Sequence, residues 1–292
     1  MEILHQLVEL FPFAIAGSIL AGIICSFLGV FIVSQRVVFL GAVLTQVAIA
    51  GVAFSFLHII HIETLIASLL GITIEKDELM HNFEPIFYSL LFAILTVIIF
   101  SQTHRQKHIT KDGILGIIFV VAIAVRIMFI QKSPVADVAE IESILKGDIL
   151  FINQTEFYIL GVILIFTVSI FTFFRKQLKF VTFDSESANA HGINSRKWLL
   201  IFYIVVGTGI SLTTRFVGDV FAFAYLIIPS SIGILTAKSV KNVFLISILV
   251  GGAVPPVAIY FAFKFDFSSG PAAVVTAFVL FLAVYVVKKL RG

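Results

Sequence analysis

The chain has 292 residues, of which 60% are hydrophobic and 13% charged, and its formal net charge is +3. Soluble domains carry about 25% charged residues, so this composition excludes an ordinary soluble protein. The small net charge gives no reason to expect a nucleic-acid partner. The single cysteine, Cys25, excludes an internal disulfide and a cysteine-rich metal site.

Apolar stretches that are each close to the roughly 20 residues needed to cross a bilayer follow one another along the chain. Backbone groups in lipid must bond within their own segment, so each stretch is expected to be a helix. The expected spans are residues 11–33, 37–60, 84–101, 113–131, 155–174, 197–214, 218–237, 243–263 and 270–288. We therefore predict an all-α, polytopic membrane bundle of about 8–9 transmembrane helices in one domain, residues 1–292, surrounded by membrane lipid.

The loops between these spans alternate in charge, with basic loops such as 102–112 and 175–197 and an acidic one at 132–154. Basic loops favour the cytoplasm, which predicts the N-terminus outside and the C-terminus inside. The first residues lack a basic region and a small-residue cleavage site, so we expect no signal peptide. The segment 140–152 is predicted to form a short amphipathic or re-entrant helix outside.

Small residues and prolines predict how some helices pack and begin. Small residues recur every four positions of the first span, at Ala14, Ser18, Gly22 and Ser26. They form one smooth helix face that is suited to close packing. We expect this face to pack within the chain rather than to form a dimer seam. Pro255 and Pro256 are expected to kink the eighth span, and Pro271 to open the last one.

Few polar residues interrupt the spans. Gln46, with Thr45 beside it, lies in the middle of the second span, where a glutamine either bonds across helices or lines a pathway. Arg126 is expected to extend outward to the membrane surface. We expect no carboxylate within the spans, which disfavours a carrier coupled to protons or sodium.

A weak metal-site hypothesis concerns the outer end of the second span. His58 and His61 share a helix face and Glu63 follows, so these side chains could bind zinc, with His81 and Glu84 as helpers. The alternative of ordinary interfacial residues is favoured, because two histidines without a fixed third ligand are insufficient for zinc.

The chain carries no nucleotide-binding loop. The stretch Gly233–Ser239 ends in Lys-Ser but lacks the second glycine before the lysine, and no zinc-protease or serine-hydrolase motif occurs.

In the basic 175–197 loop, Asp184 is suited to begin a short helix and Gly192 to end it. Such a helix would either dock a soluble partner or simply connect two spans.

Four motifs in the same order resemble the permeases of ATP-binding-cassette (ABC) importers for zinc, manganese and iron. Asp184, Ala188 and Gly192 match the Asp-x-x-x-Ala-x-x-x-Gly pattern of the family's cytoplasmic loop. The other three motifs are Gly218–Ser231, Ser269–Pro271 and Lys111–Gly116. The similarity covers nearly the full length of the chain.

One segment departs from the family pattern. Where the family usually carries Gly-Asp-Ala-Leu-Ser-His-Ala, this chain has Gly41-Ala42-Val43-Leu44-Thr45-Gln46-Val47. The Asp and His that are thought to line the metal path are therefore Ala42 and Gln46. Either transfer occurs without this site, other residues supply it, or the cargo differs, for example a chelate.

The resemblance implies a fold like that of type II ABC importer permeases and a non-enzymatic transport subunit in a bacterial or archaeal cytoplasmic membrane. Two copies would pair, a solute-binding protein would deliver the metal or chelate outside, and a separate ABC ATPase would drive import. The chain itself would hold no cofactor, while ATP and Mg would bind the ATPase. The implied positions are the path residues Ala42, Thr45, Gln46, Tyr225 and Pro229, and the coupling residues Asp184, Ala188, His191 and Gly192.

Three other functions stay open at this point. A secondary carrier would need coupling ions and usually shows internal repeats. A membrane assembly protein without cargo would be consistent with the missing Asp/His pair. An ABC permease for siderophore or cobalamin-type cargo would keep the helical frame and change the path.

Overall fold

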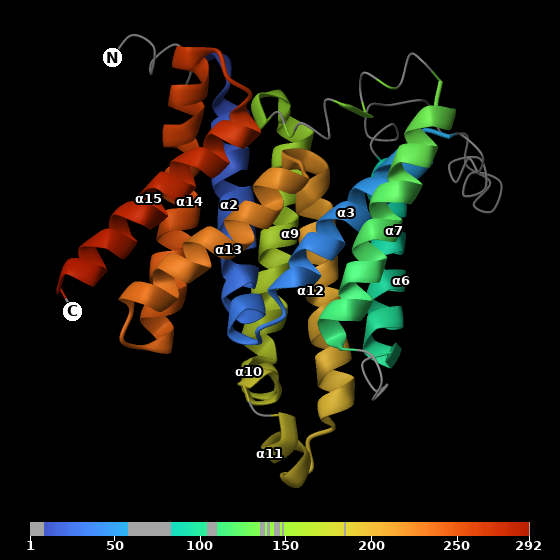
Figure 1. Cartoon of the computed structure of the whole chain (residues 1–292), viewed down its shortest axis with the longest axis vertical. Helices are drawn as coiled ribbons and strands as arrows, with labels where there is room; N and C mark the ends of the chain where they lie inside the picture. Colours follow the sequence, from blue (N-terminus) through green and yellow to red (C-terminus); the bar gives the residue numbers. More distant parts are fainter. Residues whose placement is uncertain are drawn as a thin grey trace.

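The computed structural model describes residues 9–57, 83–103, 110–134, 138, 141–142, 147, 149–183 and 185–291, and the regular elements in these ranges are helices (Figure 1). Nine helices within the described residues are long and apolar enough to cross a membrane. They are α2 (Pro12–Ser34), α3 (Val38–Ser55), α6 (Phe83–Thr103), α7 (Lys111–Lys132), α9 (Gln154–Phe173), α12 (Ser195–Val217), α13 (Asp219–Thr236), α14 (Val240–Phe265) and α15 (Ser269–Arg291). The predicted all-α membrane bundle is therefore confirmed.

Short polar side chains fix where several helices begin. Asn153 forms a capping box with Glu156 at the start of α9, its side chain accepting from the Glu156 N–H at 2.9 Å. Thr110, Asn194 and Ser239 cap α7, α12 and α14 through their side-chain oxygens. Each cap satisfies a backbone N–H that has no partner within its helix, so the polar loop residues set these boundaries.

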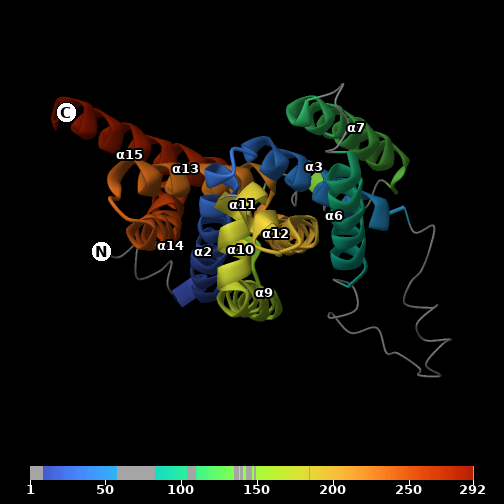
Figure 2. The ribbon, with the colours of Figure 1, turned by 90° about the horizontal axis from the view of Figure 1, so that it is seen from below.

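Two helices, α2 and α3, each pack against several others. Helix α2 packs against α9, α12, α13 and α14, while α3 packs against α6, α7, α12 and α13. Viewed along the bundle in Figure 2, α3, α7, α13 and α15 lie toward one side and α9 toward the other. Helices α2, α3 and α12 are mostly buried, whereas few residues of α7, α9 and α15 are buried, as in helices that face lipid or a second subunit.

The small residues of α2 bring three backbones into contact. A Cβ atom added at Gly22 would overlap the carbonyl oxygen of Gly251 in α14. One added at Gly29 would overlap the carbonyl oxygen of Leu226 in α13, and nearby the Ser230 hydroxyl donates to the Ser26 carbonyl oxygen at 3.1 Å. The face predicted from the four-residue spacing therefore packs within the chain, which confirms that expectation.

Three further expectations concern helix shape and the outer loop. Pro271 lies in the first turn of α15, as predicted. Helix α14 continues through Pro255 and Pro256, and the kink expected there stays a prediction. The segment 140–152 is described only in part, and its described end contains η1 (Ile149–Phe151), a single turn of 3₁₀ helix.

Candidate functional site

A polar cluster joins three helices inside this apolar bundle. The side-chain amide of Gln46 on α3 donates from Nε2 to Oδ2 of Asp219 on α13 at 2.7 Å. The guanidinium of Arg126 on α7 donates from Nη1 to Oε1 of Gln46 at 2.8 Å, and the same nitrogen lies 3.4 Å from Oδ2 of Asp219. Gln46 thus connects a cation and an anion that also contact each other.

Local backbone structure positions the carboxylate of Asp219. Gly218 has φ of 79°, a conformation in which glycine avoids the steric cost of a side chain, and it lets the chain turn directly from α12 into α13. Asp219 is the first residue of α13, and its Oδ1 accepts from the Val220 N–H at 2.8 Å. The positive end of the helix dipole therefore also stabilises this carboxylate.

The two charged side chains are largely withdrawn from solvent. Arg126 and Asp219 keep only 18% and 10% of their side-chain surface accessible. Charges this buried need partners, and the pair neutralises itself. The Nε atom of Arg126 is buried without a hydrogen-bond partner in the described part of the chain.

A cavity of about 260 Å³ opens beside this cluster. Four helices contribute to its wall, which consists of Ala42, Thr45, Gln46, Phe119, Asp219, Val220, Phe223, Ala224 and Val274. The side-chain groups on this wall that could hold a cation are the Asp219 carboxylate, the Gln46 amide oxygen and the Thr45 hydroxyl. Oxygen donors of this kind suit hard divalent cations such as Mn²⁺ more than zinc, which prefers nitrogen and sulfur.

The residues predicted to line a path divide into two groups. Ala42, Thr45 and Gln46 line the cavity, with the Thr45 hydroxyl donating to the Ala42 carbonyl oxygen at 2.9 Å. Tyr225 and Pro229 are buried in α13 away from it, and the Tyr225 hydroxyl donates to the Ala273 carbonyl oxygen at 3.3 Å. The structure therefore brings the first three residues together and places the other two in packing contacts.

Two sequence expectations about charge in the spans are wrong. Arg126 does not extend outward to the membrane surface, because its guanidinium bonds inward to Gln46 and Asp219. A carboxylate does lie in a membrane helix, since Asp219 begins α13. A signal for this pair was present in the sequence. Asp219 stands at the start of one apolar stretch, and Arg126 lies within another without a partner in its own stretch.

The predicted coupling segment forms two short helices, α10 (Arg175–Phe183) and α11 (Ser185–Ala190), which project from one end of the bundle (Figure 1). Gly192, with φ of 80°, ends α11, and the Ile193 N–H donates to the Ala188 carbonyl oxygen at 3.0 Å. Ala188 is buried and His191 is exposed. The short helix predicted here is confirmed, while Asp184 lies outside the described residues.

The weak zinc hypothesis falls mostly on undescribed positions. His58, His61, Glu63 and His81 lie outside the described residues, and Glu84 is buried in the first turn of α6. Among the residues that are described, no group of three His, Cys, Asp or Glu side chains could hold a metal ion. The polar cluster and its cavity are therefore the strongest candidate site in this part of the chain.

Comparison with known proteins identifies the family. The model of the ABC 3 transport family matches residues 8–288. The chain is 26% identical over 275 residues to the manganese import system permease protein ScaB of Streptococcus gordonii, covering 92% of this chain and 88% of that protein. It is 27% identical over 279 residues to the high-affinity zinc uptake system membrane protein ZnuB of Haemophilus influenzae, covering 94% and 95%.

The fold also matches a solved structure, that of PsaBC from Streptococcus pneumoniae in complex with Fab. The TM-score is 0.77 at 22% identity, over 97% of this chain and 94% of the other. The family match over nearly the whole chain confirms the resemblance that the four sequence motifs indicated. This multi-pass membrane protein therefore belongs to the ABC 3 transport family.

Proposed function

We propose that this chain is the membrane-spanning subunit of an ABC importer that moves a divalent metal ion across the cytoplasmic membrane. Two copies would form the path, an extracytoplasmic solute-binding protein would deliver the cargo, and a separate ATPase binding ATP and Mg would dock at α10 and α11. The observation that carries the proposal is the cavity beside the Gln46–Arg126–Asp219 cluster, whose mostly apolar wall carries side-chain oxygen donors from Thr45, Gln46 and Asp219, within a bundle of this family. The names of the manganese and zinc relatives support it.

The donor set of the cavity favours manganese-like cargo. Asp219 and Gln46 offer oxygen atoms, and among the described residues neither histidine nor cysteine lines the wall. Arg126 holds the carboxylate in the structure described here, so an incoming cation has to displace the guanidinium from Asp219. During transport the metal ion would therefore replace the Arg126 guanidinium at the Asp219 carboxylate.

The proposal is tested by ATP-driven uptake of radioactive Mn²⁺, supplied with the solute-binding protein, into proteoliposomes that hold the chain and its ATPase. Asp219→Asn should lower uptake at least about tenfold, because Asp219 is the only charged side chain among the described residues of the cavity wall, and its charge attracts a cation. The matched control is Asp266→Asn, at an exposed left-handed position after α14 where asparagine is well tolerated. Equal uptake by all three proteins would contradict the proposed path.

A second test restores metal ligands to α3. Residues 42 and 46 lie one helical turn apart and both line the cavity, so Ala42→Asp with Gln46→His would direct a carboxylate and an imidazole to one point. Calorimetry should then record zinc affinity at least about tenfold above that of the unaltered protein. The control pair Ala42→Asn with Gln46→Asn adds neither ligand. Unchanged affinity in the Asp/His variant would show that this face does not meet the cargo.

One observation favours a second candidate cargo, a metal chelate with anionic groups. The Nε of Arg126 is buried without a partner in the described residues, so a rearrangement of the polar cluster would free it for an anionic group, and guanidinium groups bind carboxylates through paired N–H donors. The two candidates differ in the uptake assay. Excess citrate should abolish uptake of a bare ion and support uptake of a carboxylate chelate.

A further inference from the structure

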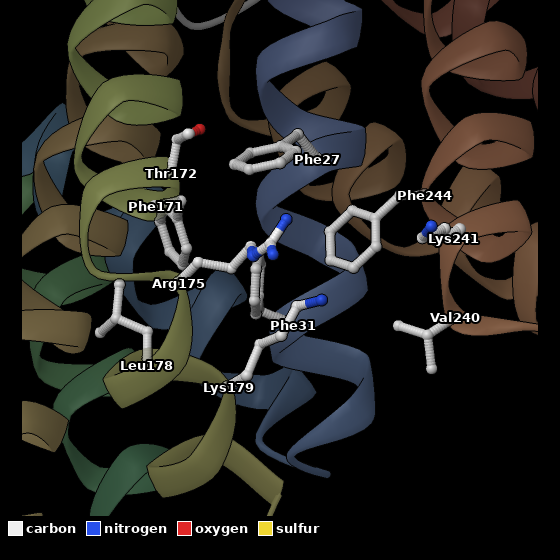
Figure 3. Close-up of a pocket in the computed structure, with 10 residues that line it drawn as sticks. All are labelled: Phe27, Phe31, Phe171, Thr172, Arg175, Leu178, Lys179, Val240, Lys241 and Phe244. Carbon is white, nitrogen blue, oxygen red and sulfur yellow. The ribbon is translucent and has the colours of Figure 1, made fainter.

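A second pocket lies between α2, α9, α10 and α14, away from the polar cluster (Figure 3). Its volume is about 290 Å³, and four phenylalanines form its floor: Phe27 and Phe31 of α2, Phe171 of α9 and Phe244 of α14. The ring centroids of Phe31 and Phe171 are 4.3 Å apart, and those of Phe31 and Phe244 are 4.9 Å apart. The floor is therefore one continuous aromatic surface, suited to a hydrocarbon chain.

Three cations border this floor. Arg175 and Lys179 come from α10 and Lys241 comes from α14, and Figure 3 shows the first two reaching toward the rings from one side while Lys241 stands on the other. No acidic side chain lines the pocket, and none of the three cations forms an ion pair within the described part of the chain. A positive rim around an apolar floor is complementary to a ligand with an anionic head and an apolar body.

The position of the pocket identifies the source of such a ligand. Arg175 and Lys179 lie where the membrane helix α9 passes into α10, at the end of the bundle that the basic loops place in the cytoplasm. Nearby, α9 and α14 expose Phe166, Leu245 and Leu249. Anionic lipid head groups lie at this level of the inner leaflet, and basic pockets between membrane helices bind them.

We propose that this pocket binds one anionic phospholipid, with its phosphate among Arg175, Lys179 and Lys241 and the start of an acyl chain on the phenylalanine floor. A free phosphate ion would bind only the three cations of the rim, and the four aromatic rings of the floor would contribute nothing to its affinity. Isolated exposed lysines are common at membrane surfaces, whereas here cations from two helices share one hollow with a continuous apolar floor. The proposal does not depend on what the transporter carries.

The test measures lipid binding to the full chain by native mass spectrometry after delipidation in detergent. Phosphatidylglycerol is compared with phosphatidylcholine of the same acyl chains. The unaltered protein should bind one phosphatidylglycerol at least about tenfold more tightly than phosphatidylcholine. Each cation contributes about 1 kcal/mol, so Lys241→Gln should weaken this binding about fivefold and Arg175→Gln with Lys179→Gln about 25-fold.

The matched control is Lys176→Gln with Lys289→Gln, which removes the same charge from two exposed positions outside the pocket. This pair should bind phosphatidylglycerol as the unaltered protein does. Equal loss in the control pair would show a diffuse surface effect and overturn the proposal. Displacement of the lipid by inorganic phosphate would do so as well, since it would identify a site for the free ion.

Discussion

Replacing Arg126 by methionine is expected to raise the affinity of the purified transporter for Mn²⁺ by at least about tenfold. The guanidinium lies 3.4 Å from Oδ2 of Asp219, so it competes with any cation for that oxygen. Two unit charges about 4 Å apart interact by about 4 kcal/mol near a protein surface, and the partial exposure of both groups reduces this value. Asp219 keeps its hydrogen bonds from Gln46 and from the Val220 N–H, so an anionic ligand remains in place. Equilibrium binding of radioactive Mn²⁺ measures the change.

The control for this prediction is Arg126→Lys, which keeps the positive charge on a flexible side chain. Its affinity for Mn²⁺ should stay near that of the unaltered protein. Equal affinities in the Met and Lys variants would show that the charge of Arg126 does not oppose the cargo. A fall in the affinity for manganese citrate in the Met variant, with no gain for the bare ion, would instead favour the chelate as cargo.

Gly29→Ala is expected to destabilise the fold severely. The new methyl group would overlap the backbone oxygen of Leu226 and approach the Ser230 hydroxyl, and backbone atoms of a packed helix cannot move aside as a flexible side chain can. Overpacking of this kind costs about 3 kcal/mol or more, which corresponds to a fall of roughly 5–10 °C in the melting temperature. Thermal unfolding followed by size-exclusion chromatography measures it.

Gly161→Ala is the matched control for this substitution. Gly161 also lies in a membrane helix, α9, but a Cβ atom there would meet no atom within 4 Å. Alanine favours a helix over glycine by about 1 kcal/mol, so this variant should melt at the same temperature or slightly higher. If both variants lose stability equally, the contact between α2 and α13 is not the cause.

The sequence predicted the helices well because one physical constraint governs them. A chain that crosses lipid must be apolar, helical and about 20 residues long, and each of these properties is visible within a single segment. The expected span 155–174 became Gln154–Phe173, and 270–288 became Ser269–Arg291. The poorest boundary is that of 37–60, where apolar residues continue past the end of α3 at Ser55.

The polar cluster could be predicted only in part, because its members are far apart in the chain. Gln46 was identified, since a midplane glutamine stands out within its own span. Its partners Arg126 and Asp219 lie 80 and 173 positions away, and nothing in a single sequence links such positions. Without those partners, Arg126 was assigned to the membrane surface and Asp219 was overlooked.

The glycine contacts of α2 determine which parts of the molecule can separate. A Cβ atom at Gly22 or Gly29 would overlap the backbone of α14 or α13, so these three helices are in backbone contact and are expected to stay together if the bundle rearranges. Asp219 belongs to that group, whereas Gln46 and Arg126 belong to α3 and α7, which pack on each other outside it. A shift between the two groups would part Asp219 from both partners while the bond between Gln46 and Arg126 survives. The cluster therefore links the two groups of helices, and a separation between them would expose the Asp219 carboxylate to a cation in the cavity.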